Sequence, residues 1–240
     1  MIKFFRKIRQ QLLTENKSGK YMIYAFGEIL LIIVGVLIAL SAAEWNSNRK
    51  NVIIETKALK EIYKGLQSDQ AALELTINDV EYGIKSITTL DSLLNEDMPT
   101  YTNSLDTLFG SVYGFRFFWF DKTNYEDFKV NNLNLIKSDS LRQQLILVFE
   151  SSYSSNERNY NTEIWVNDIL RPYYLQNFHS LIFTKSASPI NYNSLWADTY
   201  YKNLVNYRLV FLKTVIRNSY ISLKGEIEKL MKLIENYIEL

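Results

Sequence analysis

Residues 51–97 read NVIIETKALKEIYKGLQSDQAALELTINDVEYGIKSITTLDSLLNED, and this stretch decides the fold. Every seventh position is apolar, at Leu59, Leu66, Leu73, Val80, Ile87 and Leu94. A companion series at 63, 70, 77, 84 and 91 reads Tyr, Gln, Ile, Ile and Asp. A seven-residue repeat of this kind predicts a long helix with a coiled-coil-like seam. We expect the helix to end near Asp97, because Pro99 restricts the residue before it and cannot donate a backbone hydrogen bond.

An apolar run precedes this helix. Residues 21–43 contain one charged side chain, that of Glu28, and their length suits a membrane span better than a signal peptide. The small residues at 41–43 would suit cleavage by a signal peptidase, which is the alternative. We predict a retained transmembrane helix at 21–45. It should continue directly into the next helix, since no helix breaker follows Trp45 in the next ten positions.

The first 20 residues carry six basic side chains and one acidic side chain. A basic segment before a span is typical of the cytoplasmic side, so the C-terminal part is predicted to lie outside the cytoplasm. Apolar residues at spacings of three and four also predict an amphipathic helix at 1–20 on the membrane surface. Its lipid contacts are assigned to Lys3, Phe5, Arg6, Lys7, Ile8, Arg9 and Leu12. Alternatively, these charges only set the orientation during insertion.

The chain as a whole is predicted to be all-α, with residues 46–240 forming an extracytoplasmic antiparallel helical bundle. The expected elements are short helices at about 104–137, a long helix at about 138–172, a connection at 179–194 and a last helix from about 195 to the end. The short helices are expected to cap the bundle away from the membrane, because the first long helix delivers the chain there.

Residues 115–120, FRFFWF, gather aromatic side chains without a clear period. Buried aromatic residues are ordinary core material, so the first interpretation is a plug that closes one end of the bundle. The second interpretation is a ligand cage or a patch that contacts a partner. The candidate partner patch consists of Phe115, Phe117, Phe118, Trp119 and Phe120.

One face of the predicted span holds its unusual residues. Gly35, Ala39 and Ala43 follow a small-xxx-small spacing, which lets helices approach closely in lipid. The complete span packing face is Tyr24, Glu28, Gly35, Ala39, Ala42 and Ala43. This face predicts a homo-oligomer or contact with a partner membrane protein.

Glu28 supports two interpretations. An ionisable residue in a span is a functional candidate, so an oligomeric ion or proton pathway around Glu28 is the alternative function. With Tyr24 and Trp45 in the aromatic belts, Glu28 lies only about 6 Å inside the inner belt. This shallow depth favours a polar latch on the face that meets another helix.

Two stretches resemble a known family. They are residues 2–40, IKFFRKIRQQLLTENKSGKYMIYAFGEILLIIVGVLIAL, followed by EWNSNRK at 44–50, and residues 124–145, NYEDFKVNNLNLIKSDSLRQQL. Both are similar to uncharacterised single-span proteins of Bacteroidota, catalogued as a domain of unknown function. The usual junction of that family resembles ALQINNWN, where this chain has ALSAAEWN at 39–46, and the difference leaves the span intact. The resemblance implies a Gram-negative inner membrane and a periplasmic helical domain, and it transfers no catalytic residues.

The chain holds no catalytic signature. His179 is the only histidine and there are no cysteines, which excludes Ser-His-Asp and Cys-His arrangements and leaves metal binding to carboxylates. Residues 51–240 carry 19 basic and 23 acidic side chains, a poor match for nucleic acid. We therefore expect no enzyme, cofactor, metal site or nucleic-acid partner. The predicted function is a membrane-anchored scaffold, sensor or accessory subunit that acts through protein–protein contacts, with membrane lipids as a further partner.

Overall fold

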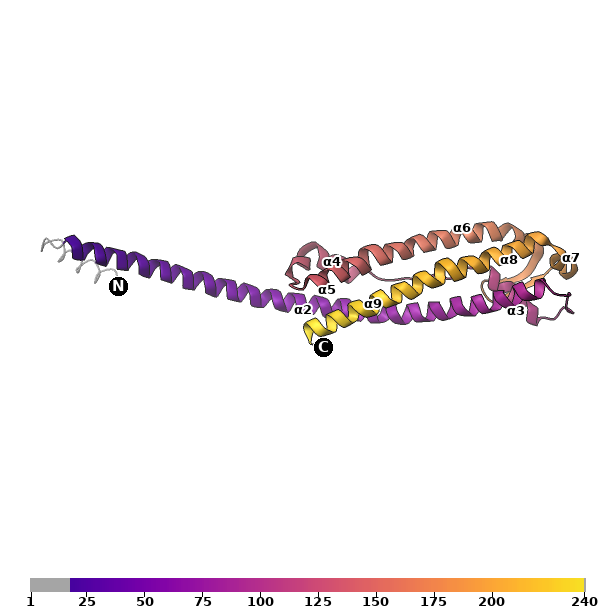
Figure 1. Cartoon of the computed structure of the whole chain (residues 1–240), viewed down its shortest axis with the longest axis horizontal. Helices are drawn as coiled ribbons and strands as arrows, with labels where there is room; N and C mark the ends of the chain where they lie inside the picture. Colours follow the sequence, from indigo (N-terminus) through magenta and orange to yellow (C-terminus); the bar gives the residue numbers. More distant parts are fainter. Residues whose placement is uncertain (1–17, 240) are drawn as a thin grey trace. The chain divides into compact units, whose positions relative to one another are not determined.

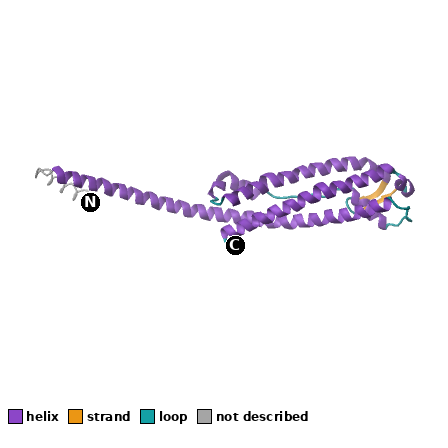
Figure 2. Cartoon of the chain, in the orientation of Figure 1, coloured by secondary structure: helices purple, strands orange, loops and turns teal. Residues whose placement is uncertain are grey.

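Helices make up most of the computed structural model, which describes residues 18–239 (Figure 1). The all-α prediction is confirmed at this level, and a two-stranded sheet is the one addition in the described part of the chain (Figure 2). The α-helices and strands are α2 (Ser18–Leu94), α3 (Ser104–Val112), α4 (Thr123–Asn132), α5 (Asp139–Ile146), α6 (Tyr153–Asn177), β1 (Phe178–Ile182), β2 (Ser186–Pro189), α7 (Tyr192–Ala197), α8 (Thr199–Phe211) and α9 (Arg217–Ile238). A 3₁₀ turn, η1 (Leu133–Leu135), and two π-helical turns, η2 (Leu147–Ser152) and η3 (Leu212–Ile216), join them.

The chain divides after Ile54 into two compact units. In the N-terminal unit, α2 is the one helix of the described chain that is long and apolar enough to cross a membrane, and its apolar window is unburied. Ile23 and Leu31, for example, are 75% and 64% exposed. This is compatible with a single membrane span. The predicted membrane-surface residues Lys3, Phe5, Arg6, Lys7, Ile8, Arg9 and Leu12 lie outside the described residues.

The second unit, called the helical unit below, is built on residues 55–94 of α2. All six seam positions of the seven-residue repeat are at most 1% exposed. A second buried line lies one position before the expected companion series, at Ile62, Asp69, Gly83 and Leu90, and Ile84 of the expected series is buried as well. Tyr63 and Gln70 stay partly exposed because they hydrogen bond to α9 at the edge of the interface.

Helix α9 runs antiparallel to this part of α2 (Figure 1). Polar side chains pair along the two helices, and as the residue number rises on α2 it falls by the same amount on α9. The pairs are Tyr63 with Glu235, Gln70 with Glu228, Glu74 with Lys224 and Glu81 with Arg217. The register between these two helices is therefore defined along about five turns of helix.

The short helices do not all lie at one end of the helical unit. Helix α3 packs on β2, whereas α4 lies beside the start of the unit, where Asn124 Nδ2 donates to the Glu61 carbonyl at 3.5 Å (Figure 1). Residues 113–122 connect them without helix or strand, and the seven residues 115–121, after the turn at Gly114, can span about 23 Å when extended. The expectation that this whole segment caps the far end is therefore wrong, because the extended connection returns the chain along the helices.

Two expected boundaries also differ. Pro172 lies inside α6, which ends at Asn177, and the expected connection contains the hairpin β1–β2 with Ser180 and Thr184 at positive φ. The hairpin packs closely on α3, where a Cβ on Gly110 would lie 2.1 Å from the Ser186 backbone nitrogen. The expected last helix begins at Thr199, where Asp198 caps it after the short helix α7, and α8, η3 and α9 follow one another without a break to Ile238.

Candidate functional site

The extended residues 115–120, called the aromatic strip below, alternate between the core and the surface. Arg116 and Phe118 are 1% and 3% exposed, whereas Trp119 is 69% exposed and Phe117 is half-buried. Successive side chains of an extended segment point to opposite sides, which explains the alternation. The strip lies along the helices, with Arg116 beside α2 and Phe118 beside α6, and not across one end of the unit as a plug would.

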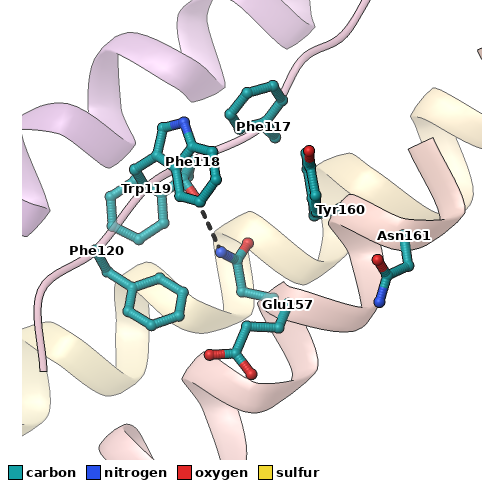
Figure 3. A pocket seen from close by; sticks show the side chains of 8 residues that line it. Phe117, Phe118, Trp119, Phe120, Glu157, Tyr160 and Asn161 are labelled. Atoms are coloured by element: carbon teal, nitrogen blue, oxygen red, sulfur yellow. Dashed lines mark hydrogen bonds between the residues drawn. The ribbon is translucent and has the colours of Figure 1, made fainter. Parts of the chain in front are cut away.

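On its α6 side the strip forms a small aromatic cluster (Figure 3). The ring of Phe117 meets those of Trp119 and Tyr160 nearly edge to face, at centroid distances of 5.1 and 5.0 Å. The rings of Trp119 and Tyr160 lie 5.5 Å apart. These contacts hold an exposed indole in place, beside a cavity of about 250 Å³. The cavity is lined by Phe117, Phe118, Trp119, Phe120, Asn156, Glu157, Tyr160 and Asn161.

Asn156 ties the strip to α6. Its Nδ2 donates to the Phe118 carbonyl at 2.9 Å, and its Oδ1 is buried without a hydrogen-bond partner among the described residues. At the rim, Lys122 pairs with Glu157 at 3.0 Å and lies 5.2 Å from the centre of the Phe120 ring. The cavity therefore combines aromatic walls with amide and carboxylate groups, a composition typical of binding sites.

A second cavity of about 420 Å³ lies on the α2 side of the strip. It shares Phe117 and Trp119 with the first cavity, so the two flank the same pair of rings. Its lining consists of Leu75, Thr76, Asp79, Phe115, Arg116, Phe117 and Trp119.

Arg116 is the unusual group of this second cavity. Its Nε lies 3.3 Å from Asp79 Oδ2, but no guanidinium nitrogen makes a hydrogen bond to any described residue. Gly83 makes room for it, because a Cβ there would lie 2.6 Å from the guanidinium carbon. Burial, and secondarily the charge of Arg208, lower the pKa of Arg116 to about 10, so the group remains charged at neutral pH.

Behind Arg116 lies a buried polar network. Arg208 Nη1 pairs with Glu163 Oε2 at 3.0 Å, and both side chains are fully buried. Arg208 also donates to the Gly114 carbonyl at 2.8 Å, while the Gly114 amide donates to Asn167 Oδ1 at 2.9 Å. Burial raises the pKa of Glu163, and the neighbouring Arg208 opposes that rise. The network holds the backbone at the point where the strip begins, and Gly114 has the positive φ of 130° that this turn requires.

The structure separates the residues of the candidate partner patch. Phe118 belongs to the core, and Phe120 is half-buried with its ring 4.1 Å from that of Tyr153. Phe115, Phe117 and Trp119 line the α2-side cavity together. The exposed part of the patch is therefore centred on Trp119.

The span packing face lies entirely on α2. Ala39, Ala42 and Ala43 are exposed, Glu28 is half-buried, and no other atom lies within 4 Å of the place where a Cβ on Gly35 would be. Tyr24 belongs to the same helix. A substitution at Gly35 consequently meets no obstacle among the described residues.

Several residues of the site were missed by reasoning from the sequence. A charged residue amid aromatic residues was a visible signal for Arg116, since such a charge requires a partner when it is buried. Asp79, Asn156 and Tyr160 gave no such signal, because they are ordinary polar residues of long helices and reach the strip only through packing.

Comparisons with protein-family models, with curated proteins and with solved structures found no match for this chain. In the described residues, no three His, Asp or Glu side chains are grouped so that they could hold a metal ion. The functional argument therefore depends on the geometry of the chain itself.

Proposed function

We propose that this chain is a single-span membrane-anchored binding protein, a scaffold, sensor or accessory subunit whose aromatic strip is the recognition surface. The observation that carries the proposal is Trp119, which is 69% exposed yet held by Phe117 and Tyr160 between two cavities. Preordered, solvent-exposed Trp residues beside pockets are typical binding hot spots, because they bury a large area at low entropic cost.

The membrane anchor is supported by the unburied apolar face of α2. Large apolar side chains such as Leu30, Leu37 and Ile38 are at least 50% exposed, and no described residue of the N-terminal unit covers them. Transfer of each such side chain from water to hydrocarbon contributes about 1.5–3 kcal/mol. Six basic residues in the first 20 support a cytoplasmic N-terminus, and hence a helical unit outside the cytoplasm. The family resemblance implies that this compartment is the periplasm of a Gram-negative cell.

Self-association or pairing with a partner span is part of the same proposal. Gly35, Ala39 and Ala43 line one face of α2 and leave it open to the close approach of a second helix. Within the helical unit, the antiparallel pairing of α2 with α9 supports a bundle that presents the strip at a constant distance from the first residue of the unit, Glu55.

The topology can be tested with single cysteines, since the chain has none of its own. Leu175→Cys lies at an exposed position of α6, and Gln10→Cys lies in the basic N-terminal segment. In spheroplasts with intact inner membranes, a membrane-impermeant maleimide should label position 175 and not position 10. Labelling of position 10 alone would reverse the proposed orientation.

The recognition surface can be tested by photo-crosslinking in native membranes. Benzoylphenylalanine replaces Trp119 in one variant and Leu175, which is 64% exposed, in the matched control. We expect a discrete adduct from position 119 and none from position 175. The same adducts from both positions, or none from 119, would count against the strip as the binding surface.

A further inference from the structure

The cavity on the α6 side of the strip already has a cation at its rim. The Lys122 Nζ lies 3.0 Å from Glu157 Oε1 and 5.2 Å from the centre of the Phe120 ring. A cation within about 6 Å of an aromatic ring centre is attracted by the negative charge density of the ring face. Phe120 and Glu157 both line the cavity, whereas Lys122 does not belong to the lining. The groups that hold the lysine ammonium are therefore also presented to the inside of the cavity.

Three further rings form a corner of the same cavity (Figure 3). Phe117 lies at 89° to Trp119 and at 72° to Tyr160, and the planes of Trp119 and Tyr160 meet at 45°. Rings at such angles face different directions, as the walls of an aromatic cage do, and not one direction as in a parallel stack. Trp119 is 69% exposed, and the other two rings are half-buried. A ligand in the cavity can consequently reach these rings.

Glu157 gives the cavity its sign of charge. Its side chain is 57% exposed, and Oε1 is the oxygen that contacts Lys122, while no described residue donates to Oε2. The lining formed by the described residues contains no basic side chain. A carboxylate beside aromatic walls favours a positively charged ligand and repels an anion. The cavity is therefore suited to a cation that shares Glu157 with Lys122.

The lining also indicates which kind of cation fits. A primary ammonium carries three N–H donors and is strongly hydrated, so it needs several acceptors when it leaves water. Asn156 offers it none, because its Nδ2 donates to the Phe118 carbonyl and its Oδ1 is inaccessible to solvent. A quaternary ammonium has no N–H group and presents methyl groups to the ring faces, which makes it the typical ligand of aromatic cages. A volume of about 250 Å³ limits the ligand to a small compound.

From these observations we infer that the α6-side cavity binds a small, free quaternary ammonium compound. Its methyl groups lie against Trp119 and Tyr160, and its positive charge lies beside Glu157. The inference rests on the proposed function in one respect, namely that the aromatic strip is a binding surface. It adds the chemical class of a ligand that the strip recognises.

Calorimetric titration of the full chain in nanodiscs of phosphatidylglycerol, a lipid without a quaternary ammonium, tests the inference directly. Choline is the probe, and empty nanodiscs provide the blank. The first comparison compound is 3,3-dimethylbutanol, which has the shape of choline but a carbon atom in place of the charged nitrogen. The second is ethanolamine, which keeps the charge as a primary ammonium. We expect saturable binding of choline and at least about tenfold weaker binding of both comparison compounds. Equal affinity for choline and 3,3-dimethylbutanol would overturn the role of the charge.

Glu157→Gln and Trp119→Leu are the deciding variants, because both side chains are exposed and their replacement leaves the core intact. Each should weaken the binding of choline at least about tenfold. Asp168→Asn is the matched control, since Asp168 also lies on α6, is 50% exposed and pairs with Arg171. If Glu157→Gln and Asp168→Asn bind choline alike, the ligand lies elsewhere and the inference is overturned.

Lys122→Met tests the shared carboxylate with a change in the opposite direction. The variant removes the cation that competes for Glu157 and for the Phe120 ring. We expect choline to bind at least about threefold more tightly to this variant than to wild type. Unchanged or weaker binding would overturn the placement of the ligand beside Glu157.

Nanodiscs of phosphatidylcholine distinguish a free compound from a lipid headgroup, which carries the same quaternary ammonium. An affinity for choline that is unchanged in these nanodiscs supports a free compound. A loss of at least about tenfold would overturn that assignment, because it would show that headgroups occupy the cavity.

Failure of this inference is distinguishable from failure of the proposed function. If choline does not bind wild type at about millimolar concentration, the weakest range of specific ligands, the quaternary ammonium site is overturned. An adduct obtained in parallel from benzoylphenylalanine at position 119 would still support a partner at the strip.

Discussion

Arg208 Nη1 lies 3.0 Å from Glu163 Oε2, and neither side chain is exposed to solvent. The same arginine donates to the Gly114 carbonyl, two positions before Arg116. This pair therefore joins α6 to α8 and holds the start of the aromatic strip. The placement of the candidate site depends on a buried ion pair whose two members are 45 residues apart.

Glu163→Gln should lower the free energy of unfolding by about 3–5 kcal/mol, because it leaves Arg208 and Arg116 without a compensating buried carboxylate. The double variant Glu163→Gln/Arg208→Met should be less destabilised than the sum of the single variants, since it removes both charges. Urea unfolding of the full chain followed by circular dichroism provides the measurement. Additive losses would show that the two side chains act independently.

Gly83→Ala should destabilise the helical unit by about 1–3 kcal/mol, because the new methyl group would overlap the Arg116 guanidinium. Gly65→Ala is the control on the same helix, where the nearest atom to the added Cβ is 3.9 Å away. The free energy of unfolding of that variant should rise by up to about 1 kcal/mol, because alanine has a higher helix propensity than glycine. Thermal unfolding of both variants checks the difference, and equal effects at the two positions would contradict the packing of Arg116 against α2.

Asp69 predicts a pH dependence of stability. Its carboxylate accepts a hydrogen bond from Tyr153 at 2.5 Å, and burial raises its pKa from 3.8 to about 6. The folded state thus holds the proton more tightly than the unfolded state. The contribution of Asp69 to the free energy of unfolding is therefore greatest below about pH 4. It is lost as the pH rises through 6, and the total loss is about 3 kcal/mol.

Asp69→Asn isolates this effect, because the amide does not titrate while its oxygen still accepts from Tyr153. Unfolding free energies of wild type and variant are compared at pH 4.5 and 7.5. The free energy of unfolding of the variant should rise by about 2 kcal/mol relative to that of wild type between the two pH values. A difference that is independent of pH would mean that Asp69 has an ordinary pKa in the folded state.

Trp119→Ala and Phe118→Ala distinguish the surface of the strip from its core. Phe118 is 3% exposed, so its truncation should cost about 3–5 kcal/mol. Trp119 is 69% exposed, so its truncation should cost less than about 1 kcal/mol while removing the proposed recognition surface. Chemical unfolding of the two variants measures how much unfolding free energy each one loses. The reverse order of losses would refute the alternation of residues 115–120.

Gly35→Leu should reduce self-association or partner binding of the span, because a large side chain keeps helices apart in lipid. A Cβ added at Gly35 meets no side chain of the described residues within 4 Å, so the fold itself should be unaffected. Gly27→Leu is the control, since Gly27 lies about 80° away around the helix and is equally free of neighbours. Light scattering of detergent-solubilised protein gives the mass. A wild-type mass of one chain, with no copurifying partner, would contradict the proposal that the span has a packing face.

Parts of this fold could be predicted from local pattern. The seven-residue repeat from Leu59 to Leu94 is buried throughout, as expected, because apolar periodicity states which face of a helix avoids water. The position of the short helices could not be predicted in this way. Residues 113–122 hold no regular structure that would reveal their direction, and only their packing on α2 and α6 shows that they return along the unit.

The sequence by itself determined the helical character of the chain, the apolar run before Trp45 and the aromatic composition of the strip, because each is a property of neighbouring residues. Only the tertiary structure decided that Arg116 lies beside Asp79 of α2 and that the Trp119 ring packs against Tyr160 of α6. Those pairs join segments 37 and 41 positions apart, and their geometry follows from how helices pack and from where an extended segment crosses them. No local pattern encodes such a contact, since the same residue types at the same spacing also occur on solvent-exposed helix faces.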